Sequence, residues 1–339
     1  MDHGLQGVAP IRRRAAVYRR LLHFSSRFLH SVRYACFSRS QGRIVQAILA
    51  LRECIMSLEA SVTAPVEHHL AVGRRADTLS RRALDWSVRA CYGTVLLGQL
   101  LFVAYLLLFY VGHALRGQFE VWNKVVPRGY VPGDTLANVM MGMHVMLAAV
   151  VITGGLLQLL PWLRRRLPAL HRWNGRVYVV AALVVAGAGL YLIWVQGRAG
   201  ELALHLGMTL NACLILFFAA QAWREGWRRN IEAHRRWALR LFIVVSGVWF
   251  FRVALMFWVM ASGGPVGFDP DTGTGPTLDV LAFANYLLPL AVLEAVFFAQ
   301  SRAEARGRWV VAGLLAVMSL AMLVGIAIAA MAMWLPWMR

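Results

Sequence analysis

The sequence predicts an all-α membrane protein with about seven transmembrane helices, and two observations support this fold class. Hydrophobic residues make up 59% of the 339 residues and the mean hydropathy is +0.58, whereas soluble domains are about half apolar. About seven apolar stretches are long enough to cross about 30 Å of hydrocarbon, which takes about 20 helical residues. Because lipid offers the backbone no hydrogen-bond partner, each stretch is expected to be helical.

The distribution of arginine predicts how these spans are oriented. The expected spans are residues 90–113, 137–162, 177–197, 202–223, 238–261, 280–300 and 309–333. The segment before the first span and the connections after the second, fourth and sixth are rich in arginine, whereas residues 263–279 contain none. Since basic loops stay on the cytoplasmic side, we expect a bacterial inner-membrane protein with a cytoplasmic N-terminus and a periplasmic C-terminus.

The same pattern divides the chain into four regions. Residues 1–87 form a basic cytoplasmic region, partly helical or disordered, in which residues 43–62 have helical periodicity but too many charges to span. Residues 88–136 hold the first span and an external loop. Residues 137–262 are expected to form a central four-helix bundle, and residues 263–339 an external loop and two final spans.

The net charge of +19 does not indicate nucleic-acid binding. The basic residues lie between apolar runs, whereas a nucleic-acid-binding domain gathers them on one polar face. An anionic lipid leaflet attracts such juxtamembrane basic residues, so membrane lipids are the expected partners. The four cysteines show no CxxC spacing, which indicates neither a zinc site nor a disulfide framework.

Histidines in or beside the spans are candidate ligands of haem iron. His144 and His205 each lie near the external end of a span, and imidazoles from two helices can bind one b-type haem. His113 also lies at an external helix end and could replace either ligand. His171 and His234 lie at the cytoplasmic ends and could bind a second haem. The alternative is that these histidines form hydrogen bonds with neighbouring helices, loops or headgroups.

The positions of these histidines also suggest a repeated unit. Each half of the central bundle contains an outer histidine, an apolar helix, an arginine-rich connection, a His-Arg segment and a returning helix. Two such units in the same orientation imply a pseudo-twofold axis along the membrane normal.

Arg252 is the most unusual charged residue of the sequence. It lies about ten residues, or about 15 Å, from the outer end of its span, where a charge is costly unless it has a partner. We expect it to face a haem propionate or an anionic substrate near His144 and His205, or to bind carbonyl groups of a broken helix. Glu294 is expected nearer the cytoplasm, so a direct pair between them would miss by several ångströms.

Two basic segments could hold anions or lipid headgroups. Arginines four residues apart share one face of a helix, and guanidinium groups bind phosphate or carboxylate with two hydrogen bonds. Lipid anchoring by the same groups is the alternative. The residues concerned are Arg172, Arg176, Arg235, Arg236 and Arg240.

Four segments resemble a family of predicted bacterial membrane proteins, domain of unknown function 2306. They are GMHVMLAAVVITGGLLQLLP, LHRWNGRVYVV, AHRRWALRLF and FFRVAL, within residues 137–262. The resemblance points to His144, Gly155 with Gln158, the two His-Arg segments and Arg252 as the family's recurring positions. It implies a membrane-embedded four-helix core and no particular activity.

These observations lead to two expectations for function. The first is a membrane oxidoreductase in which a b-type haem, bound by His144 and His205, exchanges electrons with a quinone or another redox partner. The second is a protein that binds or transports a small anionic molecule. No catalytic nucleophile constellation, carboxylate pair or phosphate-binding glycine loop is present in the sequence, so hydrolase and kinase chemistry are not indicated.

Overall fold

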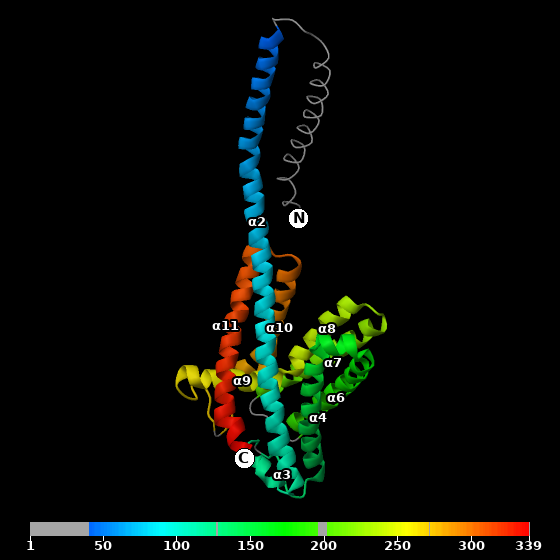
Figure 1. Ribbon diagram of the computed structural model, residues 1–339. Helices are drawn as coiled ribbons and strands as arrows, with labels where there is room; N and C mark the ends of the chain where they lie inside the picture. The colour runs from blue at the N-terminus through cyan, green and yellow to red at the C-terminus, as the bar shows by residue number, and fades with distance from the viewer. Residues whose placement is uncertain (1–40, 127, 196–201, 271, 339) are drawn as a thin grey trace. The chain divides into compact units, whose positions relative to one another are not determined.

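The computed structural model describes residues 41–126, 128–195, 202–270 and 272–338 (Figure 1). Within these residues the chain forms helices and turns without a strand, and the single β-bridge joins Asp269 to Thr274. The prediction of an all-α fold is therefore confirmed. Predictions made for residues 1–40 lie outside the described part of the chain.

The helices follow one another with short connections. In chain order they are α2 (Gln41–Tyr105), η1 (Leu106–Val111), α3 (Gly112–Leu115), η2 (Phe119–Lys124), α4 (Thr135–Leu159), α5 (Pro161–Arg166), α6 (Pro168–Trp194), α7 (Leu202–Trp227), α8 (Ile231–Val245), α9 (Gly247–Ser262), α10 (Pro276–Ser301), α11 (Ala305–Ala329), η3 (Ala330–Trp334) and η4 (Leu335–Trp337).

Six of the described helices are long and apolar enough to cross a membrane, and α8 with α9 makes a seventh if this bent pair is one span. This agrees with the prediction of about seven spans. The helices expose many large apolar side chains, which lipid would cover. Exposed tryptophans occur near helix ends, including Trp173, Trp194 and Trp227, as is typical of the two membrane–water interfaces.

Contacts divide the chain into two units, residues 1–75 and residues 76–339. In the first unit the described residues 41–75 belong to α2, so the helix expected at residues 43–62 is confirmed. The second unit contains all the other elements. The second unit therefore includes turns of α2 before residue 88, where we expected the region of the first span to begin.

Two helical hairpins form the central bundle of the second unit. α4 packs against α6, α7 packs against α8, and α6 also contacts α7. Small and aromatic side chains fill the interior between them, including Ala182, Ala219 and Tyr178. Helix α10 adds Tyr286, which is fully buried and donates a hydrogen bond to the carbonyl of Gly207 on α7 (3.0 Å).

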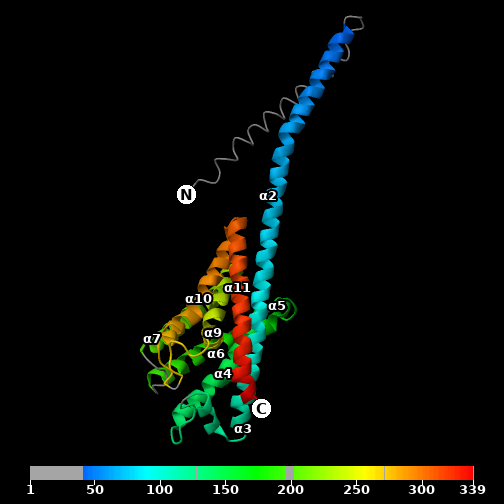
Figure 2. The same cartoon turned by 90° about the vertical axis from the view of Figure 1, so that its left-hand side faces the viewer.

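The end of α2 within the second unit lies beside α10 and α11, as both views show (Figures 1 and 2). Leu84 of α2 packs with Val296 of α10 and Leu315 of α11. Further along α2, Phe102, Tyr105 and the neighbouring aromatic residues pack against α9, α11 and α4.

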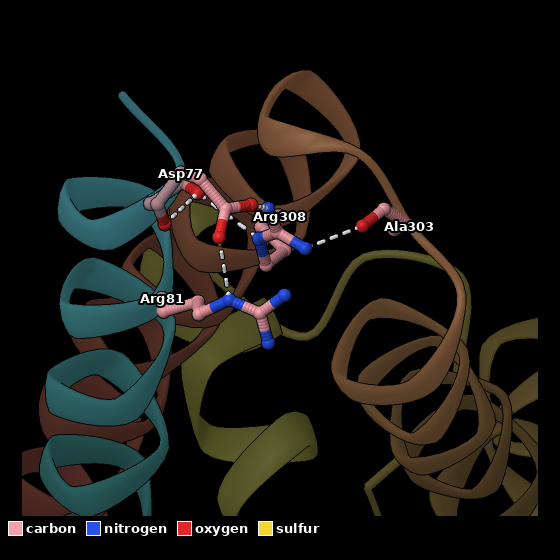
Figure 3. A network of polar contacts seen from close by, with 5 residues as sticks. Asp77, Arg81, Ala303 and Arg308 are labelled. Atoms are coloured by element: carbon pink, nitrogen blue, oxygen red, sulfur yellow. Dashed lines mark hydrogen bonds and ion pairs between the residues drawn. The ribbon is translucent and has the colours of Figure 1, made fainter. Parts of the chain in front are cut away.

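A buried arginine fixes the beginning of α11 to α2. Arg308 is 3% exposed and forms an ion pair with Asp77 of α2. It also donates hydrogen bonds to the hydroxyl of Ser80 (3.0 Å) and the carbonyl of Ala303 (2.5 Å). Figure 3 shows Arg308 between Asp77 and Ala303, with Arg81 on the second oxygen of Asp77 (2.8 Å).

Candidate anion-binding site at a broken helix

The span formed by α8 and α9 is broken at Ser246 and Gly247, where the two helix axes differ by 53°. The Ser246 hydroxyl donates to the carbonyl of Phe242 (2.8 Å) and accepts a hydrogen bond from Nε2 of Gln99 (2.9 Å). Serine bonded to the preceding turn bends helices, and Gly/Ser pairs are common places for kinks. The sequence Ser-Gly therefore accounts for the break.

Two asparagines lie against the break because residue 247 has no side chain. A Cβ atom at Gly247 would lie 2.8 Å from Oδ1 of Asn285 and 3.1 Å from Nδ2 of Asn211. Asn285 donates its amide hydrogens to the carbonyls of Leu281 (2.7 Å) and Ala282 (2.9 Å), both on α10. Its oxygen is thereby directed toward the break. Asn211 Oδ1 is buried and has no partner among the described residues.

A cavity of about 240 Å³ opens beside the break. Helix α9 lines it with one stripe of side chains, and α7 and α10 contribute the two asparagines. Most of the remaining lining is apolar. The residues of the α9 stripe are Val248, Phe251, Arg252 and Leu255.

Arg252 is the only cationic residue among those that line this cavity. Its guanidinium carbon lies 5.5 Å from the ring centre of Phe102 on α2. Its Nε is buried and has no hydrogen-bond partner within the described residues. An unneutralised guanidinium beside an apolar cavity favours an anion strongly, because little water is present to compete.

The two predicted outer ligands of haem contact α6 at different places. Nδ1 of His144 on α4 donates to the carbonyl of Val185 (3.2 Å), and the ring lies against Gly189. The ring of His205 on α7 packs edge-on against Trp194 at 5.3 Å. Positions 189 and 194 of a helix are about 140° apart around its axis.

The two histidines therefore contact different sides of α6. His144 is nine residues from the start of α4 and His205 three residues from the start of α7, which places them at depths of about 14 Å and about 5 Å in their helices. His205 lies between Leu204 and Leu206, and of its neighbours Leu204 and Met208 line the cavity of Arg252. The structure thus brings Arg252 near the helix that carries His205, and His144 belongs to the α4–α6 contact.

The inner histidines belong to a matching pair of helix contacts. Gln158 donates to the backbone carbonyl of His171 (2.7 Å), and His234 donates from Nδ1 to the carbonyl of Ala222 (2.8 Å). Nδ1 of His171 and Oε1 of Gln221 are buried without a partner in the described chain. Each hairpin therefore has a glutamine and a histidine at the place where its two helices meet.

The five arginines of the His-Arg segments have different surroundings. Arg240 is held by Glu294 of α10, Arg236 by Glu232 (3.0 Å), and Arg176 stacks on Trp173 at 5.0 Å. Arg240, one of the arginines predicted to bind an anion or a headgroup, is thus bound to a carboxylate of the protein itself. Arg172 and Arg235 are exposed at the surface.

Several site residues were missed from the sequence, although signals for them exist. The dipeptide Ser246-Gly247 inside a span is a recognisable kink signal, and Asn285 is a polar residue inside another span. The second glutamine could have been found by spacing, because His171 follows Gln158 by 13 residues and His234 follows Gln221 by the same number.

The fold and this cavity define a multi-spanning α-helical membrane protein with a largely apolar cavity, lined by one arginine and two asparagines, at a discontinuous helix. Residues 141–273 match the family described as "Predicted membrane protein (DUF2306)", so this part of the chain is similar to that family. The matched region contains the break, Asn211 and Arg252, and the family has no assigned function. Comparisons with curated proteins and with solved structures gave no match.

Proposed function

We propose that this membrane protein binds a small anionic molecule in the cavity at the α8–α9 break and transports it across the membrane. The observation that supports this proposal is Arg252, whose buried Nε has no partner within the described residues and whose side chain lines the cavity. Glu294, a carboxylate of the neighbouring helix α10, is already bound to Arg240. An anionic ligand would supply the missing charge.

The free energies of burying and partnering Arg252 favour a ligand over a purely structural role for this residue. An arginine at the centre of a transmembrane helix costs about 2.5–3.5 kcal/mol on insertion scales. The contact with Phe102 offsets about 0.5–2 kcal/mol of this, the usual range for cation–π pairs. The remainder is free energy that an anion can recover on binding.

The broken helix favours transport over simple binding. Membrane transporters bind substrate at discontinuous helices, where helix N-termini point toward anionic groups. Here α9 begins at Gly247, and the N–H groups of its first turn have no acceptors within α9. The positive end of its dipole therefore lies at the break.

The test uses the full chain reconstituted in lipid nanodiscs and in proteoliposomes, with hexanoate as the probe. Binding is expected in nanodiscs and counterflow uptake in proteoliposomes, and Arg252→Gln is expected to lower both at least tenfold. Arg306→Gln, an exposed arginine of α11, serves as the matched control and should leave both unchanged. Binding that is absent or insensitive to Arg252→Gln would overturn the anion site, and binding without uptake would overturn the transport role.

Haem binding is the second candidate, and one observation favours it. The Nδ1 bond from His144 to Val185 fixes the ring and leaves Nε2 with its lone pair, as in many metal-ligating histidines. The position of His205 against Trp194, on another side of α6, gives less support to a shared haem. We therefore rank the anion site first.

A further inference from the structure

We infer that the ligand of this cavity carries a hydrogen-bond donor beside its anionic group, as a 2-hydroxy- or 2-amino-carboxylate with an apolar remainder does. This inference rests on the proposed anion-binding function and specifies the class of ligand. It follows from the acceptor oxygens of Asn285 and Asn211, from Arg252 in the same cavity lining and from the cavity walls.

The orientation of the Asn285 amide is fixed by its neighbours. Its nitrogen lies 2.7 Å and 2.9 Å from two backbone carbonyl oxygens, which can only accept hydrogen bonds. Exchanging nitrogen and oxygen would place three acceptors together, so the oxygen must face the break at Gly247. The cavity therefore presents an acceptor at this point.

Asn211 lines the same cavity from α7 and has a second acceptor. Its Nδ2 lies toward Gly247, while its Oδ1 is buried and lacks a partner among the described residues. Buried acceptors are costly to leave without a donor. A simple carboxylate would satisfy Arg252 and leave Oδ1 of Asn211 without a donor.

The anion and the donor must lie close together on the ligand. Gly247 and Arg252 are five residues apart, or about 7.5 Å along α9. Arg252 and both asparagines line one cavity of about 240 Å³, so a ligand that meets all three has its anionic group and its donor close together. A donor one carbon from a carboxylate suits this arrangement.

The rest of the ligand must be small and apolar. Leu204, Met208, Phe251 and Leu255 also line the cavity. Its volume of about 240 Å³ lies below the range of about 300–1,000 Å³ that is typical of pockets for drug-sized ligands. A short aliphatic chain fits both properties.

The experiment compares three probes on the full chain in nanodiscs: hexanoate, 2-hydroxyhexanoate and 2-aminohexanoate. Either substituted probe is expected to bind about tenfold more tightly than hexanoate, the usual effect of one additional satisfied hydrogen bond. Which of the two binds more tightly distinguishes a hydroxyl donor from an ammonium donor. This comparison needs no substitution in the protein.

Variants then assign the preference to the two asparagines. Asn211→Ala and Asn285→Ala should each reduce the preference for the substituted probes over hexanoate, because each removes one acceptor. Asn123→Ala, in the loop after α3, is the matched control, because its side chain bonds to Tyr130 (2.9 and 2.8 Å) and does not line the cavity.

The outcomes separate this inference from the proposed function. Arg252-dependent binding with equal affinity for all three probes would overturn the donor inference alone. A preference that persists in both asparagine variants would do the same. Loss of Arg252 dependence for every probe would overturn the anion site itself.

Discussion

Arg240 of α8 holds Glu294 of α10 with two hydrogen bonds, from Nε to Oε1 at 2.6 Å and from Nη2 to Oε2 at 2.9 Å. The same guanidinium stacks over Trp237 at 4.6 Å and Phe297 at 5.5 Å. This geometry satisfies Glu294, one of the two carboxylates of α10, the other being Asp279 in its first turn. No ion pair of Arg252 occurs among the described residues.

The Arg240–Glu294 pair predicts a modest coupling free energy. The Arg240 side chain is 19% exposed and that of Glu294 is 49% exposed, so screening reduces the interaction to about 1 kcal/mol. A double-mutant cycle of Arg240→Ala and Glu294→Ala, measured by thermal unfolding in detergent, should give a coupling of this size. Additive effects of the two substitutions would contradict the pair.

Arg308 predicts a much larger effect on stability. Removing a buried donor leaves its acceptors unsatisfied, at about 1–3 kcal/mol for each buried group. Arg308→Met should therefore lower the unfolding temperature clearly, because the buried hydroxyl of Ser80 and the carbonyl of Ala303 lose their donor, whereas Asp77 keeps Arg81. Arg306→Met, two residues earlier and exposed, should change the unfolding free energy by no more than about 0.5 kcal/mol. Equal effects of the two substitutions would contradict the role of Arg308.

The spans could be predicted from the sequence because hydropathy over about 20 residues and backbone hydrogen bonding dominate in lipid. The two hairpins were also foreseen, since their histidine and arginine segments mark the helix ends. The ion pair between Asp77 and Arg308 could not be predicted in this way. It joins residues 231 positions apart, and the arginine looked like any other basic residue of a connection.

The candidate site was predicted only in part. Arg252 stood out because an isolated charge in a span is costly, and a broken helix was among the expected partners. The convergence of Asn211 and Asn285 on Gly247 depends on how α7 and α10 pack against α9. Hydropathy and spacing carry no information on that packing, so neither asparagine was assigned to the site.

The number of spans predicts the location of the C-terminus. If α8 and α9 cross the membrane together, seven spans place the two termini on opposite sides. With the N-terminus in the cytoplasm, as the arginine pattern predicts, a reporter enzyme that is active only in the periplasm should work when fused after residue 339. An active cytoplasmic reporter at that position would show that the bent pair does not cross.

The positions of His144 and His205 predict that a single haem is not shared between them. The contacts at Gly189 and Trp194 lie about 140° apart around α6. The purified protein, produced with added haem, should therefore show no Soret band with the features of two histidine ligands. Such a band, lost in both His144→Ala and His205→Ala but kept in His113→Ala, would favour haem over the anion site.

Gly247 provides a test of the break that does not remove a polar group. An alanine there would place Cβ 2.8 Å from Oδ1 of Asn285 and 3.1 Å from Nδ2 of Asn211. The asparagines would have to move, so Gly247→Ala should weaken probe binding and cost about 1–3 kcal/mol of stability, as overpacking does.

Gly93→Ala in α2 is the matched control, because no atom lies within 4 Å of its added Cβ. In a helix interior this change should stabilise by about 0.5–1 kcal/mol, so the two alanines should shift the unfolding temperature in opposite directions. Unchanged binding in Gly247→Ala would show that the asparagines do not form the site.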